Sequence, residues 1–97
     1  MTTVIENQFR VFRAFSDERR LKILELLRSG EQCAGVIGET LDLAQSTLSY
    51  HLKILCESGV VESRPEGKWT YYRISNKGSL EAQAFLKELC PAPMEDS

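Results

Sequence analysis

The sequence has no long hydrophobic run, and this absence excludes a membrane-spanning helix. Apolar runs extend over only a few residues, whereas a transmembrane helix needs roughly 20 consecutive, mainly apolar residues. The N-terminal segment also contains Glu6 and Arg10 where a secretory signal would need an unbroken apolar block. We therefore expect a cytoplasmic protein with no membrane partner.

Cysteine and histidine are both scarce. The chain has 3 cysteines, an odd number, and they are too widely spaced to resemble the framework of a secreted disulfide protein. We expect reduced thiols. Nucleophilic cysteine catalysis needs a base within hydrogen-bond reach, and the single histidine, His51, lies in a segment assigned to packing. Glycine-rich phosphate loops and paired carboxylate sites are also missing from the sequence, so we predict that the protein is not an enzyme.

An excess of positive charge is missing as well. The formal net charge of −2 argues mildly against a nucleic-acid partner, because phosphate neutralisation is the main source of such affinity. The distribution of charge matters more than the sum. Acidic residues dominate after Leu80. Between Ala44 and Ser79 basic residues outnumber acidic ones, and the basic residues are Lys53, Arg64, Lys68, Arg73 and Lys77. A basic face can therefore exist on a mildly acidic protein.

The strongest pattern in the chain predicts a helix over Gln45–Ser58, called the reading helix below. Leu48, Leu52 and Leu55 recur at helical spacing and form one apolar stripe, while the opposite face is small and rich in hydroxyl groups. That polar face suits a close approach to a flat polar surface, and a helix of this size fits a DNA major groove, which is about 12 Å wide. Gly59 is expected to end the helix.

A weaker and shorter helical signal precedes the reading helix. It extends over residues 31–42, with Val36, Ile37 and Leu41 able to point inward, and Leu43 and Ala44 form a brief connection. A short helix, a tight turn and a longer helix constitute a helix-turn-helix motif, here over residues 34–58.

After Gly59 the apolar period changes from that of a helix to that of a strand. One strand is expected from Val60 to Arg64, followed by a turn over residues 65–67 and a return strand in which apolar and polar residues alternate. This hairpin, over residues 60–74, is predicted to be a wing. With Arg64 and Lys68 beside its tip, it could follow a phosphate backbone; an ordinary solvated turn is the alternative.

Two further helices flank this central unit. The first, over residues 4–15, has an aromatic stripe, and the last, over residues 80–89, has a similar apolar face. We expect these two faces to form a dimerisation layer because a small domain has difficulty burying them alone; the alternative is that the first helix packs only within its own domain. The predicted interface residues are Ile5, Phe9, Phe12, Phe85, Leu86 and Leu89.

Between the first helix and the helix-turn-helix, Ser16 is expected to cap a helix that carries the leucine-rich segment LKILELL and forms the buried centre. Residues 91–97 are expected to be a flexible acidic tail. With 97 residues the chain has material for one small core, so we expect residues 1–97 to form a single domain. The predicted fold class is mainly α with a small β-hairpin: a dimeric winged helix-turn-helix in the order α-α-α-α-β-β-α.

The segments SDERRLKILELL and AQSTLSYHLKILCESGVVESRPEGKWTYYRIS resemble the arsenic-responsive repressor family (ArsR/SmtB type) of bacterial dimeric winged-helix regulators. The resemblance extends over roughly residues 9–90. It implies a homodimeric repressor that binds double-stranded promoter DNA and is released by a metal, a metalloid or an oxidant. Together with the charge pattern it gives as DNA-binding residues Gln45, Ser46, Thr47, Ser49, Tyr50, Lys53, Arg64 and Lys68.

The chain departs from the family pattern near the reading helix. Ala44 stands where the family usually has serine and cannot cap the helix with its side chain. Tyr50 stands where many members have a histidine that faces the groove, so the operator sequence is expected to differ. His51 is rotated away from the polar face, and we predict a half-buried structural role for it.

The signal that such a protein would sense is less well defined. The family's arsenite site typically reads ELCVCDL, and here the corresponding segment reads EQCAGVI. Cys33 matches the first cysteine, but Gly35 replaces the second, and a single sulfur is not a site for a soft metal. The zinc site that other members place on the last helix is expected to be absent because GSLEAQAFLKELC contains no histidine.

Cys33 and Cys90 are the remaining candidates for metal or redox sensing. Cys90 resembles in position the second thiol of redox-sensing members, although Glu25 occupies the position of their first thiol. Three interpretations of Cys33 and Cys90 are open: they form a disulfide switch, they contribute to a metalloid site, or they are unrelated. The first two are possible within one chain or across the dimer. Cys56 is interpreted as an apolar filler. No cofactor is required for the fold, and arsenite or another thiophilic ion is the candidate inducer. The alternative function, compatible with a pI near 5.4, is a winged-helix protein–protein interaction module without DNA specificity.

Overall fold

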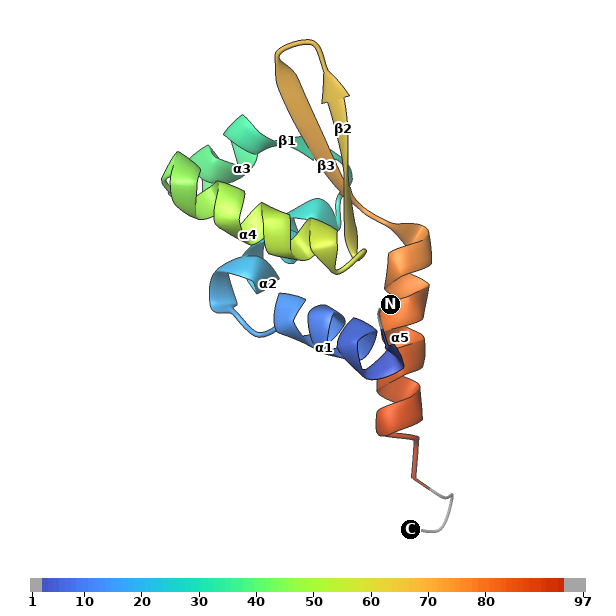
Figure 1. Ribbon diagram of the computed structural model, residues 1–97. Helices are drawn as coiled ribbons and strands as arrows, with labels where there is room; N and C mark the ends of the chain where they lie inside the picture. Colours follow the sequence, from blue (N-terminus) through green and yellow to red (C-terminus); the bar gives the residue numbers. More distant parts are fainter. Residues whose placement is uncertain (1–2, 94–97) are drawn as a thin grey trace.

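The computed structural model describes residues 3–93, which form five helices and a small three-stranded sheet (Figure 1). The elements in chain order are α1 (Val4–Ala14), α2 (Glu18–Leu27), β1 (Gln32–Cys33), α3 (Ala34–Leu41), α4 (Gln45–Glu57), β2 (Val61–Glu66), β3 (Trp69–Ile74) and α5 (Asn76–Leu89). The predicted winged helix-turn-helix is confirmed, with β1 as an additional element. Residues 94–97 of the predicted acidic tail lie outside the described part.

The sheet is antiparallel, and its strand order is β1-β3-β2. Val61 pairs with Ile74 at the base of the hairpin, and Glu66 pairs with Trp69 at its tip. The two residues of β1 pair with Tyr72 and Tyr71. β1 was not predicted, because two residues cannot show a strand period and the partner strand lies far away in the sequence.

The turn of the hairpin begins two residues later than expected. Pro65 and Glu66 belong to β2 and pair with Thr70 and Trp69, so the predicted turn over residues 65–67 is wrong. Gly67, with a φ of 61°, begins the turn instead. Proline is tolerated within β2 because this strand is at the edge of the sheet. The N–H that proline lacks is not needed there for a hydrogen bond to a neighbouring strand.

The core is assembled around α4. Its predicted stripe of Leu48, Leu52 and Leu55 is buried and packs with Ile23 of α2 and Ile37 of α3 in one apolar cluster. α2 is less enclosed than expected, because Leu21 is 47% exposed. Only the side of α2 that faces α4 is therefore buried.

Two predicted helix starts are wrong. Asp17, not Ser16, caps α2, and its carboxylate accepts hydrogen bonds from the backbone N–H groups of Arg19 and Arg20. Ser16 belongs to the end of α1, where its hydroxyl donates to the carbonyl of Phe12 over 2.6 Å. A carboxylate accepts from helix N–H groups more strongly than a hydroxyl does, which explains the choice of cap.

α5 begins at Asn76 instead of Leu80, because Ser75 caps it by accepting a hydrogen bond from the N–H of Gly78 over 3.0 Å. The first turn of α5 contains no large apolar residue, so the spacing of apolar residues could not predict it. At α4, by contrast, Ala44 provides no side-chain cap, as expected. Over residues 3–93, no helix combines the length and the apolarity that crossing a membrane requires.

A close contact between two backbones holds α5 against the end of the helix-turn-helix. A Cβ at Gly78 would overlap with the carbonyl group of Gly59, and the N–H of Ser75 donates to the carbonyl of Val60 over 2.8 Å. Only glycine allows this approach, so Gly78 fixes where α5 leaves the wing.

We predict that Gly78→Ala lowers the free energy of unfolding by about 2 kcal/mol or more, since backbone atoms cannot move aside as a side chain can. Urea unfolding monitored by circular dichroism measures this change. Gly35→Ala is the matched control, because a Cβ at Gly35 meets no atom within 4 Å. Equal unfolding midpoints for the two variants would contradict the proposed contact.

Candidate nucleic-acid interface

α3 and α4 form the helix-turn-helix, and a left-handed residue makes the turn between them. Asp42 has a φ of 54°, which aspartate adopts more readily than most residues do. The N–H of Leu43 then donates to the carbonyl of Gly38 over 2.9 Å and closes the end of α3. This turn directs α4 across the front of the core (Figure 1).

The predicted DNA-binding residues of α4 lie together on its outer face. The side chains on this face are exposed, except that Thr47 is only partly exposed. Tyr50 is 55% exposed and therefore available to a partner. The opposite face is buried by Leu48, His51, Leu52, Ile54 and Leu55. α4 thus presents a polar surface on a rigid support.

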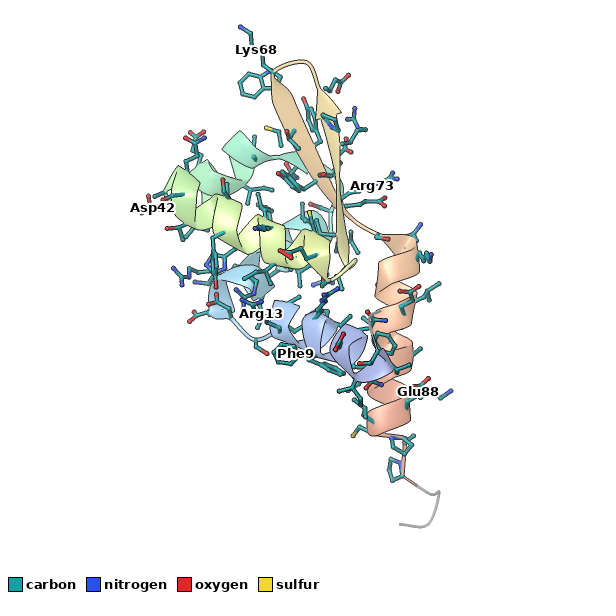
Figure 2. All side chains as sticks on the ribbon, viewed as in Figure 1. Phe9, Arg13, Asp42, Lys68, Arg73 and Glu88 are labelled. Carbon is teal, nitrogen blue, oxygen red and sulfur yellow. The ribbon has the colours of Figure 1, made fainter. Side chains whose placement is uncertain are left out.

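The wing meets this surface on the same side of the molecule. A groove of about 460 Å³ is lined by Gln45 and Ser49 from α4, by Lys68 and Trp69 from the wing, and by residues of α3. Lys68 lies at the tip of the hairpin and points outward (Figure 2). Trp69 is 59% exposed. The groove therefore combines hydrogen-bonding groups, a cation and an aromatic ring.

Arg64, a predicted DNA-binding residue, is instead held by two carboxylates. Its guanidinium donates to both oxygens of Glu31, over 3.1 and 2.6 Å, and to Glu66 over 2.9 Å. These hydrogen bonds raise the pKa of Arg64 further and lower the pKa of Glu31. The guanidinium also lies 4.8 Å from the centre of the Tyr71 ring. Glu31 is 33 positions away in the sequence, so local charge counting could not reveal this cluster.

The sheet face that carries Arg64 also carries Arg73, which forms an ion pair with its cross-strand partner Glu62. Figure 2 shows Arg73 directed away from α4. Two of the bases that suggested a basic face are therefore neutralised by acids on the far side of the wing. Among residues 3–93, Lys53 and Lys68 form no ion pair. Lys68 lines the groove and Lys53 is exposed on α4, so both charges remain available.

His51 is more deeply buried than predicted, with 1% of its surface exposed. Its structural role involves Arg20, which sequence reasoning missed. Arg20 is 6% exposed, and its Nη1 lies 2.9 Å from Nδ1 of His51. The available signal was helical spacing, because Arg20 precedes Ile23 and Leu24 by three and four positions and shares their face of α2.

The predicted dimer interface is largely an exposed apolar surface on α1 and α5. Ile5 and Phe9 on α1 are 70% and 64% exposed, and Leu86 and Leu89 on α5 are 56% and 57% exposed. Phe9 points away from the core in Figure 2. α1 contacts the core through its opposite face, which carries its buried residues. Two predicted members, Phe12 and Phe85, are half-buried within the chain. The two helices contact each other, and their exposed apolar residues are together called the apolar face below.

Comparison with known proteins identifies the family. A model described as bacterial regulatory protein, arsR family, matches residues 17–63. The HTH-type transcriptional regulator MJ1325 of Methanocaldococcus jannaschii is 39% identical over 87% of this chain and 96% of its own length. The arsenical resistance operon repressor of Bacillus subtilis is 37% identical over 81% of this chain and 74% of its length. The chain belongs to the arsR family.

The fold of this arsR-family protein also matches a solved relative. The homodimeric winged helix-turn-helix DNA-binding domain Mb0332 from Mycobacterium bovis, determined by NMR in solution, is 32% identical, with a TM-score of 0.72 over 89% of this chain and 84% of that domain. The resemblance drawn from the sequence is thus confirmed, and the chain is a winged helix-turn-helix regulator.

The candidate thiols of this arsR-family member lie apart within one chain. β1, which contains Cys33, lies beside the wing, whereas α5 ends just before Cys90 at the opposite end of the molecule (Figure 1). Within residues 3–93, no three His, Cys, Asp or Glu side chains are grouped closely enough to hold a metal ion. One chain therefore does not bring Cys33 and Cys90 together, and their joint action stays a prediction that requires two chains.

The three thiols should differ in reactivity. Cys90 is exposed, Cys33 and Cys56 are partly buried, and burial raises the pKa of the Cys56 thiol. Since the thiolate is the reactive form, we predict that a maleimide modifies Cys90 first and Cys56 last near neutral pH. Peptide mass spectrometry over time measures the order, with Cys90→Ser as the control that lacks the fast phase. Faster labelling of Cys56 than of Cys90 would contradict the described burial.

Proposed function

We propose that the protein is a homodimeric transcriptional repressor that binds double-stranded promoter DNA. The observation that carries this proposal is the shared groove, in which Gln45 and Ser49 of α4 lie on the same side as Lys68 of the wing. The names of its relatives support repression and DNA binding. Occupying a promoter blocks transcription without a second effector domain, so repression is the simplest mechanism for this fold.

In this proposal α4 enters the major groove and the wing follows the backbone. Gln45, Ser46, Ser49 and Tyr50 reach base edges, because amide and hydroxyl groups can donate and accept hydrogen bonds there, and the Tyr50 ring can contact a thymine methyl group. Thr47 is turned partly toward the protein and contributes at the edge of this surface. These side chains would supply sequence preference.

Phosphate contacts come chiefly from Lys53 on α4 and Lys68 beside the groove, because neither forms an ion pair among residues 3–93. Arg64 contributes less than its charge suggests, because binding a phosphate would require it to release Glu31 or Glu66. We assign it mainly to ordering the wing against the segment before β1. A mildly acidic protein can therefore bind DNA through a small number of cations placed where the phosphates lie.

The homodimer in this proposal is formed by the apolar face on α1 and α5. Ile5, Phe9, Leu86 and Leu89 would be covered by the same residues of a second copy in a two-fold arrangement. Two-fold pairing presents two copies of α4 to successive major grooves, about 34 Å apart along the duplex. The operator is accordingly expected to be a palindrome.

We further propose that a thiol-reactive signal releases the repressor from DNA. One chain lacks a cluster of metal ligands among its described residues, so Cys33 of one chain and Cys90 of the other would have to act together. A soft ion such as arsenite prefers several sulfur ligands. We propose no enzymatic activity, because His51 is enclosed with Arg20 and cannot serve as the base for a thiol nucleophile.

Lys68→Ala and Lys53→Ala should each weaken binding to all duplexes and reduce the slope of log K against log salt by about one unit, because one phosphate contact is lost. Fluorescence anisotropy with a labelled duplex from the promoter region, titrated with salt, measures both effects and the stoichiometry of two chains per operator. Lys87→Ala on α5 removes the same charge outside the groove and is the control.

Gln45→Ala should instead change the preference among sequences while the salt slope stays the same. A wild-type protein that binds no duplex specifically, or binds without salt dependence, would contradict the DNA-binding proposal and favour a protein partner.

For the inducer, we predict that arsenite or peroxide releases the wild-type protein from DNA and that the Cys33→Ser, Cys90→Ser double variant stays bound. The same anisotropy assay measures release, and Cys56→Ser serves as the control that retains the response. Release of the double variant at the wild-type concentration would remove these two thiols from the mechanism.

A further inference from the structure

Arg20 connects the proposed dimerisation helix to the proposed reading helix. Its Nε donates to the carbonyl of Ala14 over 3.3 Å, and its Nη2 donates to the carbonyl of Arg13 over 3.0 Å. Both carbonyls lie at the C-terminal end of α1, where a helix has no further N–H groups of its own to bind them; the carbonyl of Arg13 also accepts from the N–H of Ser16 over 3.1 Å. Its Nη1 lies 2.9 Å from Nδ1 of His51, in the middle of α4. One side chain of α2 thus joins α1 and α4.

The chemistry of this contact fixes the state of His51. The guanidinium remains protonated and has only donors, so Nδ1 of His51 must accept and the ring must be neutral with its proton on Nε2. Nε2 is buried and has no hydrogen-bond partner among residues 3–93. A second proton, on Nδ1, would place two cations in contact in a buried site, and burial accordingly lowers the pKa of His51 below 6.5.

The charged groups around His51 come from α2 and its N-cap. On α2 the surrounding groups are the carboxylate of Asp17, which favours the protonated ring, and the cations of Arg19 and Arg20, which oppose it. On α4 itself, Tyr50 meets the imidazole edge-on, with ring centres 5.2 Å apart. α1 contributes no side chain to this contact; the carbonyls of Arg13 and Ala14 accept hydrogen bonds from Arg20. The bond between Arg20 and His51 therefore exists only while the ring is neutral.

Directional hydrogen bonds restrict the orientation of α1 more than apolar packing does. α1 packs on the rest of the chain through Gln8, Val11 and Ala14, and apolar contacts hold helices together without strongly opposing small rotations or shifts. The planar guanidinium presents its donors in fixed directions. It therefore fixes the orientation of α1 relative to α4.

We propose that Arg20 is a positioning residue which, through His51, sets the distance and angle between the two copies of α4 in the dimer and so selects the spacing of the operator half-sites. This inference rests on the proposed function, because it requires a dimer bound to a palindrome. It assigns spacing preference to two buried residues that do not touch DNA.

The test uses the full chain and three duplexes that carry the half-site selected by the wild-type protein from a random library. Their half-sites are separated by the selected spacing and by spacings one base pair shorter and longer. A change of one base pair rotates one half-site around the duplex, so the wild type should prefer the selected spacing by roughly tenfold.

Three variants separate positioning from folding. Arg20→Met and His51→Leu remove the contact, and we expect them to bind the three duplexes within about twofold of one another. His51→Asn is the conservative variant, because its side-chain oxygen can accept near the position of Nδ1, and it should retain the wild-type preference. Thermal melts and sedimentation establish that each variant is folded and dimeric.

Acidification supplies the same test without removing Arg20. Because burial lowers the pKa of His51 from the ordinary value of 6.5, its ring stays neutral in the folded protein until the pH falls through that lowered value. There the wild type should lose its spacing preference while it remains a folded dimer, and His51→Asn should keep its preference. Loss of folding and of preference at the same pH would overturn the inference in favour of a purely structural role, and this result decides the question even if Arg20→Met and His51→Leu do not fold.

The outcomes distinguish this inference from the proposed function. Unchanged spacing preference in a folded Arg20→Met or His51→Leu dimer, or at low pH in the wild type, overturns the positioning role alone. If the wild type binds none of the duplexes, the proposed function fails and this inference fails with it.

Discussion

Burial of one face of α4 is the constraint on which the rest of the structure depends. Leu48, Leu52 and Leu55 are at most 5% exposed, and α4 contacts α1, α2, α3 and β2. Because the apolar stripe is held from these directions, the opposite face cannot rotate inward. The polar side chains on that face are thereby presented at fixed positions. A surface held this rigidly can discriminate among partners at low entropic cost.

Charge in this protein is organised by pairing. On the outer face of the sheet, Arg64 and Arg73 are neutralised by acids. These ion pairs connect parts of the wing and add little net positive charge to its surface. Exposed pairs of this kind contribute little to stability individually, but a cluster that joins β2 to the segment before β1 restricts where the wing can lie. Lys68 beside the groove and Lys53 on α4 form no ion pair among residues 3–93, which reconciles an acidic composition with an anionic partner.

The helices and the hairpin could be predicted from sequence because their signals are local. The apolar period of α4, the alternation in β3 and the glycine after α4 each depend on neighbouring residues. Helix starts were less accessible. Asp17 displaced Ser16 as a cap, and α5 began before its first leucine, because caps depend on single hydrogen bonds that leave no period. β1 exists only through its pairing with β3 and left no local trace.

The sequence by itself determined which face of each main helix is apolar, where the hairpin lies and which family the chain resembles, since period, turn residues and motif are properties of neighbours along the chain. Tertiary structure alone decided which charged groups are available. Arg64 meets Glu31 and Arg20 meets His51 across 33 and 31 positions, and such partners are chosen by how the elements pack. Electrostatic roles depend on distance in space and on burial, and neither quantity is written in the order of residues.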